Sequence, residues 1–345
     1  MSRIHVLHEN PAWLPPLAEA LDRNNLPWTE WFMHEATFDL ASPPPPGVFY
    51  NRMSASSHTR DHRYAAELTA AVLAWLTRWG RRVVNGSGAL DLEISKVRQY
   101  AALERHGIAT PRTVLVAGHG NIVPAARRHF ADQPVILKPN RGGKGLGVRL
   151  FASSDSLATF VGSEAWQPPV DGLTLLQEYI RAPRPVITRA EFVGGRFLYA
   201  VEVDTSDGFE LCPADACVIG DANCPVGVGN GLGEAPRGEK FTIIGGIPDT
   251  LRVRLERFLA GAGIEVAGIE FISDDAGRTL VYDVNTNTNY NPDAEHRAGR
   301  AGTARSGPGA IAAFLGAELK NLTHEIGGAY PRALDPGVEA RQRRG

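Results

Sequence analysis

The amino-acid sequence predicts a mixed α/β (α+β) protein built from more than one unit. Strand-like and helix-like segments alternate along almost the whole chain, which favours this architecture over separate all-α and all-β domains. A chain of 345 residues exceeds what one hydrophobic core usually serves, so we expect two or three domains. The 43% hydrophobic and 21% charged residues are an ordinary globular composition.

The charge balance and the first residues narrow the class of partner. A formal net charge of -2 gives no overall electrostatic reason to expect nucleic acid or a membrane, and favours small-molecule or single-protein substrates. The start, MSRIHVLHENPAWLPP, lacks the pattern of a signal peptide, and no run approaches the roughly 18 apolar residues of a membrane span. We therefore expect a cytoplasmic protein.

The N-terminal segment predicts a small α/β unit over residues 1–92. The stretch HRYAAELTAAVLAWLTRWG is rich in alanine and leucine and ends on Gly80, which indicates a helix. The expected elements are a strand at 4–7, a helix at 14–21, the helix at 62–80 and a short strand and turn at 81–86.

The segment after it, residues 93–170, predicts helices around a small sheet. Residues 92–108 have apolar residues near helical spacing and close on Gly107, a C-cap residue. The expected elements continue with a strand at 111–118, a helix at 122–131, strands at 135–138 and 148–151, and a helix at 155–164.

A third segment, residues 171–325, predicts a larger sheet, and residues 326–345 a frayed tail. Gly194 and Gly195 are a hairpin signal between two strand-like runs. Residues 207–248 are rich in Gly, Pro, Asp and Asn, which indicates one long loop region. The expected elements are strands at 173–180, 186–193, 195–203, 268–273 and 278–285, with helices at 250–263 and 310–322.

The stretch LKPNRGGKGLGV, residues 137–148, is a candidate phosphate site. It fails the Walker A pattern, because Val148 and Arg149 follow its last glycine, and it fails the Rossmann pattern, because it joins two strands. What remains is a glycine-rich hairpin whose backbone amides could approach an anion, with a plain surface turn as the alternative. Its candidate binding residues are Lys138 on the entering strand and, in the loop, Arg141, Gly142, Gly143, Lys144, Gly145 and Gly147.

A second constellation lies in GIEFISDDAGRTLVYDVNTNTNYN. If SDDAGR is a hairpin turn with Ser273 opposite Arg278, then Glu270 faces Val281, and a shift by two residues puts it opposite Asp283. Either register places Glu270, Val281, Asp283 and Asn285 on one face. Two carboxylates and an amide oxygen suit Mg²⁺. The alternatives are solvated edge-strand acids or acids paired with lysines.

Together these motifs resemble the ATP-grasp superfamily, in particular its branch of glutathione synthetases and RimK-like ribosomal-protein glutamate ligases. The similarity runs from about Asn85 to Asn291. The segment SKVRQYAALERHGIATPRT resembles the one that carries the first ATP lysine, here Lys96, and VILKPNRGGKGLGV the one with the second, Lys138. LLQEYI resembles the adenine-binding linker, ITRAEFVGG the strand with a phosphate-facing arginine, and the acidic hairpin the metal triad. The corresponding residues are Gln177, Glu178, Tyr179 and Ile180, Arg189, and Glu270, Asp283 and Asn285.

The resemblance implies an ATP-grasp fold with an N-terminal α/β domain that precedes it, and ATP and Mg²⁺ as cofactors, with Mn²⁺ as a substitute. Arg189 and Lys138 would be catalytic, and a carboxylate and an amine would be joined through an acyl phosphate. The partners would be small-molecule carboxylate and amine substrates, and the chain is compatible with a homodimer. A solvated loop is the alternative account of Arg52 and His58, which, with Asn287 and Asn289, are candidate substrate residues.

The sequence departs from the family pattern in the acceptor region. No Arg or Lys occurs between Arg196 and Arg237, where the ligases usually carry a second arginine, and Thr188 replaces the usual acid. This favours an alternative, phosphoryl transfer without amide formation; a nucleotide-binding module without catalysis is the third hypothesis. The three cysteines lack zinc-site spacing, and we expect unmodified thiols in a substrate-covering loop at Cys212, Cys217 and Cys224.

Overall fold

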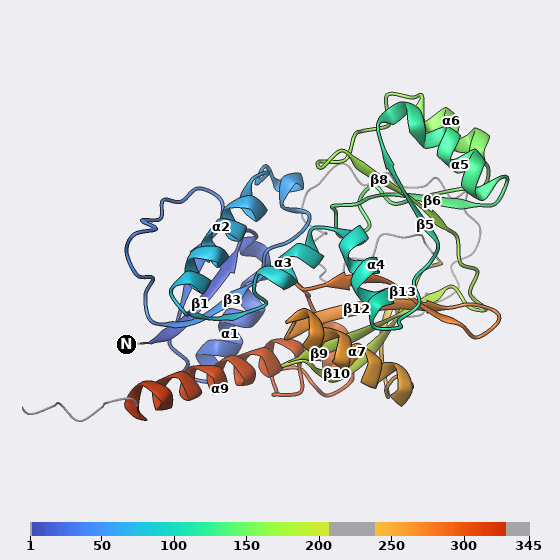
Figure 1. The fold of residues 1–345 in the computed structure, drawn as a ribbon. Helices are drawn as coiled ribbons and strands as arrows, with labels where there is room; N and C mark the ends of the chain where they lie inside the picture. The colour runs from blue at the N-terminus through green and yellow to red at the C-terminus, as the bar shows by residue number, and fades with distance from the viewer. Residues whose placement is uncertain (1, 207–238, 329–345) are drawn as a thin grey trace, which may run out of the picture.

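The structure is a computed structural model that describes residues 2–206 and 239–328, and it contains three sheets (Figure 1). The predicted mixed α/β class is confirmed. Cys212, Cys217 and Cys224 lie outside the described residues, as does most of the predicted loop at 207–248.

The N-terminal unit is a parallel sheet in the order β2-β1-β3-β4. Its strands are apolar and its helices are rich in alanine, as expected of a parallel sheet, because a parallel sheet is buried on both faces. Its elements are β1 (Arg3–His8), a 3-10 turn (Pro11–Trp13), α1 (Pro15–Arg23), β2 (Trp28–Phe32), β3 (Gly47–Asn51), a 3-10 turn (Ser57–Arg60), α2 (Ala65–Arg78) and β4 (Arg82–Val84). The strand β2 was not predicted from the sequence. It lies at the edge of the sheet with intermediate burial, so its residues do not form the apolar run of a buried strand.

The second sheet is antiparallel, with strands in the order β5-β8-β6-β7. Its helices α5 and α6 pack on one face through a core that includes Phe130 and Leu157. The elements are β5 (Thr113–Ala117), a 3-10 turn (His119–Asn121), α5 (Ile122–Phe130), β6 (Val135–Pro139), β7 (Arg149–Phe151), α6 (Ser154–Val161) and β8 (Leu173–Glu178).

The third sheet is also antiparallel, in the order β11-β10-β9-β12-β13. Gly194 and Gly195 both take positive φ angles, 60° and 69°, at the turn that joins β9 to β10, as a two-residue hairpin requires. The elements are β9 (Val186–Val193), β10 (Arg196–Asp204), β11 (Phe241–Ile244), α7 (Asp249–Ala262), β12 (Val266–Ser273) and β13 (Thr279–Asn285).

Four further helices connect these parts. The predicted helix at 92–108 is two helices, α3 (Ser87–Glu93) and α4 (Lys96–Arg105), because the Ser95 side chain accepts a hydrogen bond from the Arg98 amide and starts a new helix. The other two are α8 (Pro292–Arg297) and α9 (Gly307–Gly328). Ile311 and Leu315 of α9 share a core with Ile4 and Val48, so this late segment packs on the first sheet, below α1 in Figure 1.

Two predictions about strands were wrong. The predicted loop at 207–248 contains β11, which pairs with β10, because Phe241 buries its ring in the local core. Val281 does not share a face with Glu270: a β-bulge changes the register, so Val281 pairs with Phe271 and lies in the core. Ser273 lies opposite Thr279 rather than Arg278.

Candidate active site

A cavity of about 530 Å³ lies where β6 and β8 of the second sheet face β12 and β13 of the third. It collects most of the site residues predicted from sequence. Those lining it are Lys96, Lys138, Gly142, Gly143, Lys144, Gly145, Gln177, Glu178, Tyr179, Ile180, Arg189, Glu270, Asp283, Asn285, Asn287 and Asn289. Four predicted residues do not line it: Arg52, His58, Arg141 and Gly147.

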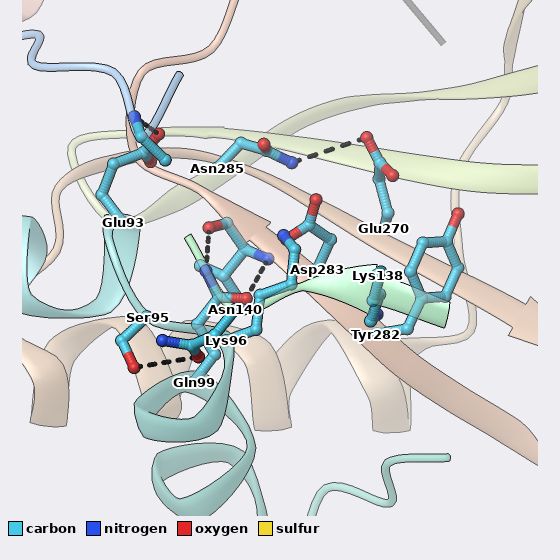
Figure 2. A network of polar contacts seen from close by, with 12 residues as sticks. Glu93, Ser95, Lys96, Gln99, Lys138, Asn140, Glu270, Tyr282, Asp283 and Asn285 are labelled. Atoms are coloured by element: carbon cyan, nitrogen blue, oxygen red, sulfur yellow. Dashed lines mark hydrogen bonds and ion pairs between the residues drawn. The ribbon is translucent and has the colours of Figure 1, made fainter. Parts of the chain in front are cut away.

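The two lysines enter the cavity from different elements and differ in electrostatic state (Figure 2). Lys96, the first residue of α4, places its Nζ 2.5 Å from Oδ1 of Asp283. Burial acts to lower the pKa of Lys96, but Asp283, together with Tyr100 and Glu270, outweighs it and the net pKa is raised. Lys138 has no carboxylate partner at that distance among residues 2–206 and 239–328; burial, and then repulsion from Lys96, lower its pKa to about 7.

Tyr100 holds Lys138 in place, and the sequence motifs did not identify it. Its hydroxyl accepts hydrogen bonds from Lys138 Nζ at 2.6 Å and from Gln177 Nε2 at 3.0 Å, and donates to the Tyr282 carbonyl oxygen at 3.0 Å. Tyr100 lies four residues after Lys96 on α4, so both side chains project from one helix face. That spacing was the one available signal.

The two predicted acids face each other across the β12–β13 pair. Glu270 lies directly opposite Asp283, and Asn285 Nδ2 lies 3.5 Å from Glu270 Oε1, a contact drawn in Figure 2. Burial raises the pKa of Glu270 although Arg189 opposes it. Among the described residues there is no cluster of three His, Cys, Asp or Glu side chains that could hold a metal. Here two carboxylates and one amide oxygen form the set, which fits a hard cation such as Mg²⁺.

Arg189 of β9 is held in a fixed orientation by three partners. Its Nε donates to Glu191 Oε1, Nη1 to Glu270 Oε1 and Nη2 to Thr288 Oγ1, each at 2.7 Å. A Cβ atom added at Gly268 would lie 2.6 Å from the guanidinium, so only glycine leaves room for this side chain. The positioning partners Glu191, Thr288 and Gly268 were missed in the sequence, because their roles depend on pairing across strands.

The glycine loop, residues 141–147, has two faces. Lys144 takes a φ of 60° and places its Nζ over the Trp13 ring, 4.5 Å from the centroid. A Cβ at Gly143 would lie 3.6 Å from the Ser56 side chain. Arg141 turns the other way and pairs with Glu67 at 2.7 Å, which explains its absence from the cavity. The N-terminal unit therefore contacts the loop on both sides.

The residues predicted to bind the acceptor are only partly in the cavity. Asn287 and Asn289 line it, and Asn287 Oδ1 is buried without a hydrogen-bond partner among the described residues. Arg52 is buried behind them, donating to the Trp13 carbonyl at 3.0 Å and to Asn289 Oδ1 at 3.1 Å. Arg52 therefore supports this end of the cavity, and His58 lies in a separate groove.

Glu93 joins three parts of the chain at the end of the cavity that Asn287 lines (Figure 2). Its carboxylate accepts hydrogen bonds from the backbone amides of Ala55, Thr286 and Asn287, at 3.1, 2.7 and 3.3 Å. Burial raises the pKa of this carboxyl group. A single side chain of α3 thus fixes the loop after β3 against the loop after β13.

Comparisons with known proteins agree with this arrangement. No family model matches the chain. A segment of 226 residues, 64% of the chain, is 25% identical to beta-citrylglutamate synthase B of Danio rerio, and 117 residues, 34% of the chain, are 30% identical to a probable alpha-L-glutamate ligase of Rhodopirellula baltica. The chain spans about half the length of the first relative (48%) and 28% of the second.

A solved structure decides the fold. The ATP-grasp ligase PsnB, in complex with a minimal precursor, matches with a TM-score of 0.62 over 92% of this chain and 99% of that chain, at 17% sequence identity. The chain has the ATP-grasp fold. The resemblance drawn from the sequence motifs is confirmed. The second and third sheets both contribute residues to the wall of the cavity. No helix in the described part of the chain is long and apolar enough to cross a membrane.

Proposed function

We propose that the protein is an ATP- and Mg²⁺-dependent ligase that joins a carboxylate to an amine, on an amino acid or small peptide, through an acyl phosphate. The observation that carries this proposal is the convergence of two lysines and two opposed carboxylates on one cavity that also contains the residues after β8. The relatives and the fold neighbour are named as synthases and ligases, which supports the same class of reaction.

In this proposal, one half of the cavity binds ATP. The purine lies against the backbone of residues 177–180, and the amides of the glycine loop approach the phosphates. Lys138, held by Tyr100, and Lys96 compensate phosphate charge without changing position during the reaction, so their contribution is preorganised. Arg189 has a fixed guanidinium at the edge of the cavity where the transferred phosphoryl group would lie.

The metal would be held by Glu270, Asp283 and Asn285. A bound Mg²⁺ supplies charge compensation for the phosphates during transfer. Before ligands bind, Arg189 pairs with Glu270 and Lys96 with Asp283, so both the buried and the partly buried carboxylate have a counter-charge.

The reaction would proceed in two displacements. A carboxylate oxygen of the substrate attacks the γ-phosphorus of ATP and the bond to the β-phosphate oxygen breaks, which releases ADP. The amine then attacks the acyl carbon, the amide forms, phosphate leaves, and the amine loses a proton. The chain contributes by holding the reactants in line in an enclosed cavity.

The decisive experiment incubates the protein with Mg·ATP and pooled amino acids, one carboxylate at a time labelled with ¹⁸O, and follows ADP, phosphate and new masses. A ligase transfers ¹⁸O to phosphate and yields a condensed product. ADP with a phosphorylated product and no condensation would refute the ligase assignment. Lys138→Ala and Asp283→Ala should abolish turnover with unchanged circular dichroism, whereas Asp275→Ala, an exposed acid on the β12–β13 turn, should not. Near-normal turnover of the first two would refute their assignment.

The second candidate is an ATP-grasp kinase that transfers the γ-phosphoryl group to an acceptor and stops there. The specific observation behind it is the absence from the sequence of any Arg or Lys between Arg196 and Arg237, since the ligases usually carry an acyl-phosphate arginine in that region. The same labelling experiment separates the two, because a kinase acting on a hydroxyl group leaves ¹⁸O in the carboxylate.

A further inference from the structure

A second groove, of about 490 Å³, lies on the outer side of the glycine loop. It runs between the N-terminal unit and the unit that contains the second sheet, and it shares Pro139 and Leu146 with the wall of the first cavity. Its volume is within the range of roughly 300–1,000 Å³ typical of ligand pockets. The reaction proposed above uses none of the side chains that are specific to this groove.

The charged side chains that line the groove all have one sign. They are Arg63 from the N-terminal unit, and Arg141 and Arg149 from either end of the glycine loop. No Asp or Glu is among the described residues that line the groove. Arg63 and Arg149 are exposed, while Arg141 is 6% exposed and its Nε is buried without a hydrogen-bond partner in the described part of the chain. One carboxylate, that of the half-exposed Glu67, binds Arg141 from outside the groove.

The walls between these arginines are apolar. Leu146 is 43% exposed, and Phe160, Trp166 and Pro169 also line the groove. The Arg149 guanidinium lies 4.6 Å from the centroid of the Phe160 ring, so an arginine is already held against an aromatic wall. Cationic groups from two units thus alternate with apolar surface.

We propose that this groove binds an acidic peptide segment, with carboxylates paired to Arg63, Arg149 and the free side of Arg141 and apolar side chains packed on Leu146, Phe160 and Trp166. The planar fork of arginine favours carboxylates. The arginines come from separate chain segments, so a ligand that satisfies more than one must carry several carboxylates with apolar groups between them, as a peptide does. The bases of a single-stranded nucleic acid could also stack on the aromatic walls, so an oligonucleotide is the competing probe in the experiment below.

The site is independent of the reaction, so binding is measured without ATP. The probe is a fluorescein-labelled peptide of alternating Glu and Leu, compared by anisotropy with its Gln–Leu version at two salt concentrations. We expect the Glu peptide to bind, the Gln peptide to bind at least ten-fold more weakly, and affinity to fall with salt. The double variant R63Q/R149Q should lose at least ten-fold in affinity, whereas R128Q/R105Q, the same change in charge outside the groove, should not.

Three outcomes would overturn the proposal. These are equal binding of the Glu and Gln peptides, an unchanged affinity in R63Q/R149Q, and binding of free glutarate or a single-stranded oligonucleotide as tight as that of the Glu peptide. Because both exchanged arginines are exposed, loss of folding is not expected, and circular dichroism checks it. Failure here leaves the ligase assay unaffected, and failure of the ligase assay leaves peptide binding measurable.

Discussion

If ATP binds beside Lys138 as proposed, its binding is linked to the uptake of a proton, which can be measured. Burial, and then the nearby Lys96, lower its pKa to about 7 in the free protein. Phosphate groups beside Lys138 would favour its charged form and raise the pKa again. Above pH 7 the free protein therefore holds a neutral Lys138, and binding of ATP must take up a proton at that side chain.

The size of the effect follows from the pKa. With a free-state pKa of about 7, Lys138 is roughly one-tenth protonated at pH 8 and nine-tenths protonated at pH 6. ATP binding should then take up about 0.9 proton at pH 8 and about 0.1 at pH 6, and the apparent affinity should fall about ten-fold per pH unit above pH 7.

Isothermal titration in buffers of different ionisation enthalpy gives the proton number directly, from the slope of observed enthalpy against buffer enthalpy. The matched control is Lys138→Arg, whose guanidinium stays protonated, so that the exchanged side chain should take up no proton at pH 8. Subtraction of the two removes contributions from Glu270 and the nucleotide. A native protein that takes up no proton at pH 8, or takes up as much as Lys138→Arg, would refute the reasoning.

Three further predictions concern single side chains. Tyr100→Phe removes the hydroxyl that orients Lys138, and we expect ATP to bind about ten-fold more weakly by titration; unchanged affinity would contradict the positioning role. Lys144→Met removes a cation–π contact with Trp13 worth about 0.5–2 kcal/mol, so amide exchange in the glycine loop should speed up, and equal protection would refute the contact. Burial lowers the pKa of His5, so below about pH 6.5 the unfolded state binds more protons than the folded state. The free energy of unfolding, measured by denaturant titration, should therefore fall from pH 7 to pH 5.5. A constant free energy over this range would contradict the lowered pKa of His5.

The charged residues of the site could be predicted from the sequence, because burying an unpaired charge inside an apolar strand costs free energy. A lysine and two acids inside apolar strands need a reason to be there, and Lys138, Glu270 and Asp283 all line one cavity. Their supports were not predictable. Tyr100 and Thr288 are ordinary residues whose roles arise only when a helix and a loop meet a strand far away in the sequence.

The glycine loop shows the same limit in a different form. Its glycines and basic residues indicated an anion-binding hairpin. The sequence does not show which way each side chain of a loop turns, so Arg141 and Lys144 were assigned the same role. In the structure they lie on opposite faces, one paired with Glu67 beside the second groove and the other over Trp13. Which way each side chain turns depends on the N-terminal unit, more than 70 residues earlier for Glu67.

The bulge in β13 shows why the register of the acidic hairpin matters beyond the metal residues. Strict alternation from Asn285 and Asp283 would have put Val281 in the cavity and Tyr282 in the core. The extra residue sends Val281 into the core, leaves Tyr282 lining the cavity, and keeps Asp283 opposite Glu270. Because the carbonyl of Tyr282 accepts the Tyr100 hydroxyl hydrogen bond, this irregularity both sets the carboxylate pair and orients the residue that holds Lys138. The positions of the acids that we propose to bind the metal and of the lysine that we propose to bind phosphate therefore depend on one local distortion, which a two-residue periodicity cannot predict.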